Sequence, residues 1–228
     1  MSEHVVIVIP AYNEEQTIIG VIRGLKTRGF ARIVVVDDGS RDRTAELAFQ
    51  EGAVVVRHLI NRGFGGAIGT ALRAALQFDA DIIVTFDADG QHDPDDISPL
   101  IEPIEQRRAD VVIGSRRPDA ARIPVSRRVA HRIANLATYV LFGLHASDTQ
   151  SGLRAFSRQA AERVRLTTSG MEASSEIFAE IARNQLRLTE VPINAIYTAY
   201  SLSKGQSFKV GLRTLAKLIL AKLRRLGQ

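Results

Sequence analysis

The sequence predicts an α/β domain in which a mainly parallel sheet is flanked by helices. Short apolar runs alternate with longer stretches of helical periodicity through the first half of the chain. These runs lack a regular alternation with polar residues, which indicates strands buried on both faces, as in right-handed βαβ units. Four of the runs lead directly into polar residues, so we expect one edge of the sheet to gather chemical groups.

Five strands and four intervening helices are predicted. The strands are expected at Val5–Ile9, Ile33–Val36, Ala53–Val56, Ile82–Phe86 and Val111–Ile113. The helices are expected at about residues 14–28, 41–51, 66–78 and 94–107, the last beginning at an Asp-Pro-Asp-Asp start signal. With no internal repeat and no low-complexity linker, the pattern favours one continuous domain.

Composition sets broad limits on what the chain can be. Its 228 residues, 45% of them apolar, suffice for the core of one α/β domain. The absence of cysteine excludes disulfides and thiolate metal sites and is compatible with a reducing cytoplasm. No apolar run approaches the ~18 residues of a membrane span, and the first strand is too short for a signal peptide. We therefore expect no transmembrane segment.

The strongest candidate site follows the fourth predicted strand. There, Asp87-Ala88-Asp89 precedes a glycine and Gln91. Carboxylate and amide oxygens suit Mg²⁺ or Mn²⁺, and Mg²⁺ commonly completes its shell with substrate phosphates, which points to a nucleoside diphosphate. An ordinary solvated acidic turn is the competing interpretation. An EF-hand is excluded, because its sixth position would be His92 and its twelfth Ser98.

Polar loops after the other strands add to this candidate site. They are residues 10–15, Pro-Ala-Tyr-Asn-Glu-Glu; 37–40, Asp-Asp-Gly-Ser; and 114–117, Gly-Ser-Arg-Arg. The glycine-rich segment at residues 63–69 lacks the G-x-G-x-x-G spacing, and the chain has no G-x-x-x-x-G-K-[ST] sequence, so neither a Rossmann dinucleotide fingerprint nor a P-loop is predicted.

Taken together, these motifs resemble the family 2 glycosyltransferases, and most closely their dolichyl- or polyprenyl-phosphate mannosyl- and glucosyltransferases. The resemblance spans about residues 5–208 and rests on Ile9–Glu15, Val36–Ser40, Asn61-x-Gly63, Asp87–His92, Gly114–Arg116, Asp148-x-x-Ser151-Gly152 and Glu190–Ile193. It implies a GT-A type fold and an inverting, metal-dependent transfer of a hexose from a nucleotide-sugar, most simply mannose from GDP-mannose, to a polyprenyl or dolichyl phosphate. Glucose or N-acetylglucosamine from a UDP-sugar is the alternative donor.

The resemblance also implies residue roles on the donor side. Asp89 and Gln91, with Asp87, would bind the metal. The nucleotide-sugar would contact Pro10, Tyr12, Glu14, Val36, Asp38, Asp87 and Ala88, with Asp38 reading the base. Taken alone, Tyr12 and Glu14 fit a helix start equally well, and Asp38 fits the cap of the helix near 41–51.

On the acceptor side, six arginines and one acid lie between Arg116 and Arg132, and Ser126–Leu144 has the periodicity of an amphipathic helix. Arg127 and His131 are i,i+4 neighbours and could address one phosphate, although a solvated basic face would give the same pattern. The family pattern has Ser where this chain has His131, and Arg where it has Lys204. Arg116, Arg127, His131 and Lys204 are the implied phosphate-binding residues, with Asp89, Arg116 and Arg127 as the catalytic set.

The last segment, residues 208–228, is predicted as a basic amphipathic helix appended to a catalytic domain of residues 1–207. Between Val191 and Gln228 there are seven Lys or Arg and no acid, within a net charge of +5. An apolar stripe beside such charge favours peripheral contact with the cytoplasmic face of a membrane, or a membrane-protein partner, over nucleic acid. Packing on the protein body is the competing interpretation.

The implied mechanism needs no general base. A phosphate monoester has a second pKa near ~6 and is largely dianionic at neutral pH, so it can attack unaided. Two other classes compete. A sugar nucleotidyltransferase would carry a glycine-rich basic loop where this chain has residues 10–14, and a non-catalytic binding module would have lost a metal ligand. A processive polysaccharide synthase is disfavoured, since its Q-x-x-R-W element requires tryptophan and the chain has none.

Overall fold

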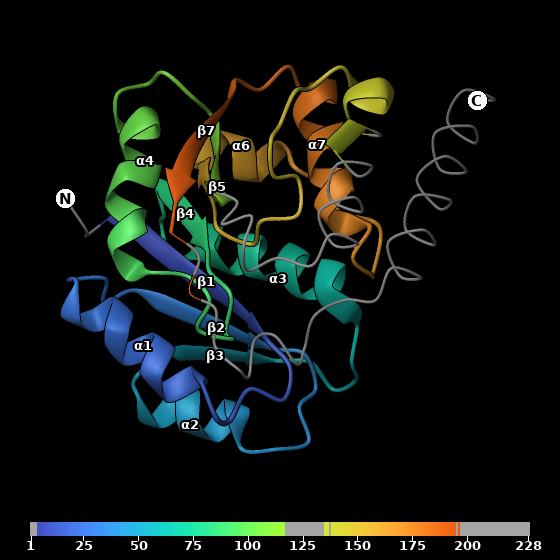
Figure 1. The fold of residues 1–228 in the computed structure, drawn as a ribbon. Coiled ribbons are helices and arrows are strands. Elements are labelled where there is room, and N and C mark those ends of the chain that lie inside the picture. Colours follow the sequence, from blue (N-terminus) through green and yellow to red (C-terminus); the bar gives the residue numbers. More distant parts are fainter. Residues whose placement is uncertain (1–3, 117–134, 137, 195, 197–228) are drawn as a thin grey trace.

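The computed structural model describes residues 4–116, 135, 136, 138–194 and 196. Within them, strands form one sheet in the order β3-β2-β1-β4-β6-β5-β7 (Figure 1). The strands are β1 (Val5–Ala11), β2 (Ile33–Asp37), β3 (Val54–Arg57), β4 (Ile82–Thr85), β5 (Val111–Arg116), β6 (Arg154–Ser157) and β7 (Leu188–Ile193). The helices are α1 (Ile18–Thr27), α2 (Thr44–Gln50), α3 (Gly63–Gln77), α4 (Ile97–Glu105), α6 (Arg158–Arg163) and α7 (Ala173–Arg183), with the 3-10 turn η2 (Pro94–Asp96) before α4.

The predicted mainly parallel α/β sheet is confirmed, and each of the five expected strands is present. Two further strands were not predicted. β7 extends the sheet in parallel beside β5, whereas β6 runs antiparallel to both β4 and β5. The β6 sequence is short and begins with a charged residue, Arg154, so it lacks the apolar run that marks its neighbours.

Helices cover both faces of the sheet. Along β1, Ile7 and Ile9 join the core beneath α1, α2 and α4, while Val6 and Val8 join the core beneath α3, α6 and α7 (Figure 1). Burial on both faces explains why the apolar runs of β1, β2, β4 and β5 show no alternation. It does not hold for β3, an edge strand whose residues are exposed or half-buried. Because β1, β2, β3, β4, β5 and β7 are parallel, their carboxyl ends lie at one edge, where β6 begins.

The amino end of α3 is packed unusually closely against the loop before α7. The helix starts at Gly63, three residues before the predicted start, and Gly63 has a φ of 78°. The Gly65 backbone nitrogen donates to the carbonyl of Ser169 at 2.9 Å. A Cβ on Gly65 would lie 2.8 Å from the Cβ of Ala173 and would overlap the carbonyl oxygen of Thr168. The glycines therefore permit a backbone contact; they do not form a dinucleotide fingerprint.

Several predictions from the sequence concern residues outside the described ranges. These are Arg127, His131, Lys204, the amino-terminal part of the helix expected at 126–144, and the basic helix at 208–228. In the part of the chain that is described, no helix combines the length and the apolar character needed to cross a bilayer.

We predict that Gly65→Ala destabilises the fold by about 1–3 kcal/mol, because the new methyl group must displace backbone at residue 168. Gly20→Ala is the matched control. Gly20 lies inside α1, where an added Cβ would have nothing within 4 Å, and the change should stabilise by about 0.5–1 kcal/mol. Urea denaturation midpoints measure both, and equal midpoints for the two variants would contradict the close contact at α3.

Candidate active site

The Asp87 carboxylate lies in a tightly built position just beyond β4. His92 Nε2 is 2.9 Å from Asp87 Oδ2, and the buried His92 ring packs edge-on against Phe86 with ring centroids 5.5 Å apart. On another side the carboxylate contacts Gly152, where an added Cβ would overlap Asp87. Burial alone would raise the pKa of Asp87, but the hydrogen bond from His92, the electrostatic interaction with His92 and the positive charges of Arg116 and Arg154 outweigh it and lower the pKa. Asp87 is therefore ionised, and His92 Nε2 is the donor.

The surroundings of Asp89, two residues further along the chain, shift its pKa in the direction opposite to that of Asp87. Its oxygens accept hydrogen bonds from the Gln91 backbone nitrogen at 3.0 Å and from Gln91 Nε2 at 2.7 Å. Burial, and then the negative charge of Asp87, raise the pKa of Asp89. Two carboxylates brought together so that one resists ionisation favour the binding of a cation, which would offset the repulsion.

The donor set agrees with a metal that shares its coordination with substrate. Among the described residues no group of three or more His, Cys, Asp or Glu side chains is arranged to hold a metal ion. Two carboxylates and the Gln91 amide suit Mg²⁺ or Mn²⁺ completed by water and phosphate oxygens. The residues present thus fit a divalent cation. The assignment of Asp87, Asp89 and Gln91 as its ligands stays a prediction.

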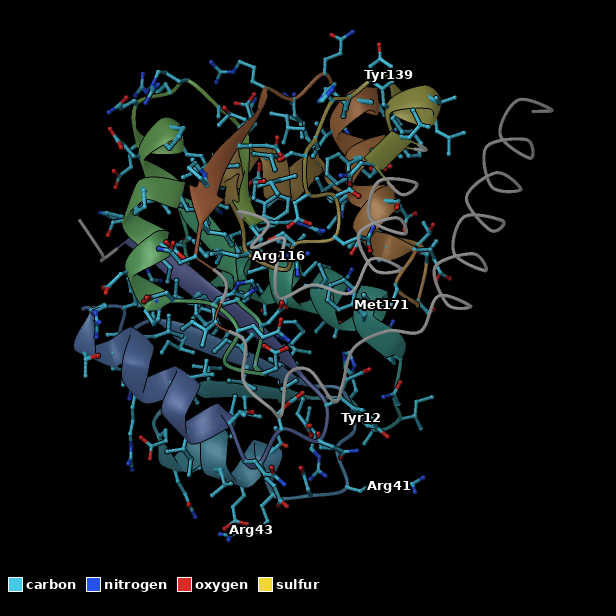
Figure 2. The ribbon with its side chains drawn as sticks, viewed as in Figure 1. Tyr12, Arg41, Arg43, Arg116, Tyr139 and Met171 are labelled. Carbon is cyan, nitrogen blue, oxygen red and sulfur yellow. The ribbon has the colours of Figure 1, made fainter. Side chains whose placement is uncertain are left out.

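The loops after β1 and β2 form the neighbouring part of this edge. Tyr12 is 42% exposed, and Figure 2 labels it together with Arg41 of the neighbouring loop. Asn13 has a φ of 54°, and its side chain accepts from the Arg41 backbone nitrogen at 2.9 Å, which ties the two loops together. Glu14 is buried, with its backbone nitrogen bonded to Thr44.

The other donor-side candidates occupy the same region. Pro10 is half-buried at the end of β1, while Val36 on β2 and Ala88 after β4 are buried. Pro10 and Val36 are register partners at the carboxyl ends of β1 and β2, and Ala88 follows β4 at the same edge, although Val36 and Ala88 belong to the cores on opposite faces of the sheet. Their predicted contacts with a nucleotide-sugar remain untested.

Asp38 is buried and joins the loop after β3 to the start of α3. Its Oδ1 accepts from the Arg62 backbone nitrogen at 2.8 Å and lies 2.7 Å from His58 Nδ1, while Oδ2 accepts from the Gly63 backbone nitrogen at 2.8 Å. The structure thus gives Asp38 a capping role, at α3 and not at the helix near 41–51. Whether it also reads a nucleobase stays a prediction.

Arg116, at the end of β5, forms a bidentate salt bridge with Asp148. Nε and Nη2 donate to the two carboxylate oxygens at 2.6 and 2.8 Å, and the guanidinium is partly exposed near the centre of Figure 2. Asp148 is held in turn by Glu190, which accepts from the backbone nitrogens of Ser147 and Asp148. The side chain of Arg116 is therefore oriented before any ligand arrives.

The chain beyond β7 returns to the loop that carries the two carboxylates. The Asn194 backbone nitrogen donates to Asp96 Oδ2 and that of Ile196 to the Gln91 carbonyl, each at 2.9 Å. The segment that continues toward Lys204 therefore starts beside Gln91.

The sequence did not reveal the roles of His92, Asp148, Gly152 and Arg154. It indicated no catalytic part for His92, and it gave the Asp148-x-x-Ser151-Gly152 motif without assigning its residues. The spacing of this motif was the available signal: it places Asp148 against Arg116 and Gly152 against Asp87. For Arg154 nothing in the sequence indicated complete burial.

We expect Gly152→Ala to lower turnover by about 10²-fold, because the methyl group must push the Asp87 carboxylate out of place and small displacements at a reacting centre are costly. Gly69→Ala is the control, since its Cβ would make only ordinary contacts, the closest at 3.7 Å. Turnover is measured alongside the thermal midpoint. Near-normal activity in a folded Gly152→Ala protein would show that the Asp87 position is not critical.

Comparisons with known proteins indicate the family of this chain. The model of Glycosyl transferase family 2 matches residues 6–165. The chain is 35% identical over 239 residues to the UDP-N-acetylglucosamine–dolichyl-phosphate N-acetylglucosaminyltransferase of Methanococcus voltae, covering 95% of each chain. It is 30% identical over 221 residues to the undecaprenyl-phosphate mannosyltransferase of Micrococcus luteus, covering 91% of this chain and 89% of that protein.

A solved structure gives the same fold. Glucosyl-3-phosphoglycerate synthase of Mycobacterium tuberculosis, crystallised with Mn²⁺, UDP and phosphoglyceric acid, aligns with a TM-score of 0.74 at 21% identity, over 96% of this chain and 78% of that one. The fold is thus the GT-A type expected from the resemblance, and the matched family model and relatives establish that this chain is an enzyme of glycosyltransferase family 2.

Proposed function

We propose that this enzyme transfers a hexose from a nucleoside diphosphate sugar to the phosphate of a polyprenyl or dolichyl phosphate. The observation that carries the proposal is the placement of two carboxylates, Asp87 and Asp89, at the same sheet edge as the oriented guanidinium of Arg116. A cation site and a phosphate site side by side suit a donor diphosphate and an anionic acceptor. The names of the Methanococcus and Micrococcus relatives supply the acceptor class.

The donor is a choice between two nucleotide-sugars. The family resemblance favoured GDP-mannose, with UDP-sugars as the alternative. The relative that shares more identity is named for UDP-N-acetylglucosamine, and the other is named for mannose transfer. These names support the UDP-N-acetylglucosamine alternative as well as they support mannose, and both donors belong in the test.

On the donor side, Asp87, Asp89 and Gln91 would hold a divalent cation, Mg²⁺ or Mn²⁺, which neutralises the diphosphate as it leaves. The Gln91 contacts orient the Asp89 carboxylate, and His92 with Gly152 fixes that of Asp87. Pro10, Tyr12, Glu14, Val36, Asp38 and Ala88 are the proposed nucleotide-sugar contacts. Fixed groups of this kind cost no reorganisation during the reaction.

On the acceptor side, Arg116, Arg127, His131 and Lys204 are the proposed phosphate contacts. A phosphate that is already dianionic attacks the anomeric carbon without a general base, with inversion. The structure is compatible with this, since His92 donates to Asp87 and His58 is buried against Asp38. Arg116 must then share its guanidinium between Asp148 and the acceptor phosphate.

Residues 208–228 are proposed to lie on the cytoplasmic face of a membrane or against a membrane-protein partner. The positive charges and apolar stripe of that segment carry this proposal. Such docking would leave the hydrocarbon of the acceptor in the bilayer while only its phosphate enters the protein.

A donor panel tests the function. GDP-mannose, UDP-glucose and UDP-N-acetylglucosamine are each offered with Mg²⁺ or Mn²⁺ and a polyprenyl phosphate, and we expect metal-dependent glycolipid from one nucleotide class. Asp89→Asn should reduce that product by at least about 10²–10³-fold, because the diphosphate loses its counter-ion. Asp95→Asn is the control, since Asp95 is exposed and pairs with Arg28. Sugar-1-phosphate formation or no product with any donor would contradict the proposal.

For the acceptor residues, Arg127→Ala should raise the KM for the lipid phosphate while donor binding stays near normal. Arg128→Ala, which removes a charge from a different face of the predicted helix, serves as the comparison. Steady-state kinetics with the acceptor varied and calorimetry of nucleotide binding separate the two effects. An equal loss of donor affinity would assign Arg127 to the nucleotide site instead.

A further inference from the structure

Arg154 is buried within the sheet, on the strand that pairs with both β4 and β5. It is the first residue of β6 and is 1% exposed, the largest fully buried side chain in the part of the chain that the structure describes. In the sheet register it lies opposite Thr85 of β4 and Ile113 of β5. Asp87 follows Thr85 by two residues, and Arg116 follows Ile113 by three, so Arg154 stands between the strands that carry the two halves of the site.

The contacts of Arg154 lead into the loop at residues 148–152. Nη2 donates to the carbonyl of Thr149 at 3.2 Å, and Nε is buried without a hydrogen-bond partner among the described residues. One end of this loop pairs with Arg116 through Asp148, and the other end packs Gly152 on Asp87. The Arg154 guanidinium is thus bonded to the loop at residues 148–152, and this loop contacts both Asp87 and Arg116.

Arg154 also interacts with the site through charge. Burial lowers its pKa to about 10, and the negative charges of Asp87 and Asp148 counteract part of that effect. It therefore remains protonated at neutral pH. An isolated buried cation would be strongly unfavourable, so the two carboxylates are the groups that make its burial tolerable.

We propose that Arg154 is a positioning residue for sugar transfer: its buried charge and its bond to the 148–152 loop hold Asp87 toward the donor diphosphate and Asp148 toward Arg116. This inference rests on the proposed function, because that function places the diphosphate beside Asp87. Arg154 touches no substrate in this role. It acts through the two aspartates, and so links the donor half of the site to the acceptor half.

A purely structural role makes a different prediction. If Arg154 served only to hold β6 in the sheet, its loss would lower stability and leave the metal requirement of the folded protein unchanged. The positioning role requires the metal requirement itself to change, since loss of the bond to Thr149 would release the loop that packs Gly152 on Asp87 and let the Asp87 carboxylate move.

Arg154→Met removes the charge at similar length, and Arg154→Lys keeps a charge but loses the planar guanidinium whose Nη2 donates to the Thr149 carbonyl. Arg158→Met is the matched control, four residues along, where the arginine is partly exposed and pairs with Glu162. Calorimetry of UDP and GDP binding at increasing Mn²⁺ gives the Mn²⁺ concentration for half-maximal binding, and thermal unfolding reports stability. We expect that concentration to rise at least about 10-fold in Arg154→Met, about 3-fold in Arg154→Lys and not at all in Arg158→Met.

The outcomes are separable. If Arg154→Met does not fold, Arg154→Lys decides alone: a threefold rise supports the positioning role, and an unchanged Mn²⁺ requirement overturns it. Loss of stability in both variants with a wild-type requirement also overturns it. Wild-type protein that binds neither nucleotide with Mn²⁺ would refute the proposed function, and this inference with it.

Discussion

The insertion of β6 between β4 and β5 is the constraint on which the site depends. β6 is antiparallel to β4 and β5, so its first residue lies at the sheet edge where those two strands end. The hydroxyl of Thr85 donates to the Gly152 carbonyl at 2.7 Å, which anchors the entry. The loop that precedes β6 is thereby placed between the residues after β4 and those at the end of β5. A parallel strand in that position would have brought its first residues to the opposite edge.

Charge balance is the second requirement of this arrangement. Asp148 and Arg154 are buried, Asp87 and Arg116 are partly exposed, and removing ions from water is costly unless each has a counter-charge. The two cations and two anions compensate each other. Asp89 lies outside this balance, which is consistent with its raised pKa and with a role in attracting a divalent cation.

Buried or partly buried carboxylates also hold loops by accepting backbone hydrogen bonds. Asp38 fixes the start of α3, Glu190 fixes residues 147 and 148, and Glu176 accepts from the backbone nitrogens of Thr167 and Thr168. The hydrogen bonds from Thr167 and Thr168 outweigh the effect of burial, so the pKa of Glu176 is lowered. Loops secured in this way present their polar groups in a fixed geometry, which is the condition for electrostatic catalysis.

By itself the sequence determined five of the described strands, the mainly parallel sheet and the carboxylates at its edge, because apolar runs and the residues that follow them are local signals. The set of motifs was also sufficient to indicate the family from the sequence alone. Only the tertiary structure decided that Arg154 is buried, that Gly152 abuts Asp87, and that Asp38 caps α3. Each of these contacts joins residues distant in the chain. The short β6 sequence has too little apolar character to predict a strand or its antiparallel orientation. Local patterns report which surfaces are buried, whereas the pairing of charges across strands depends on how those surfaces come together.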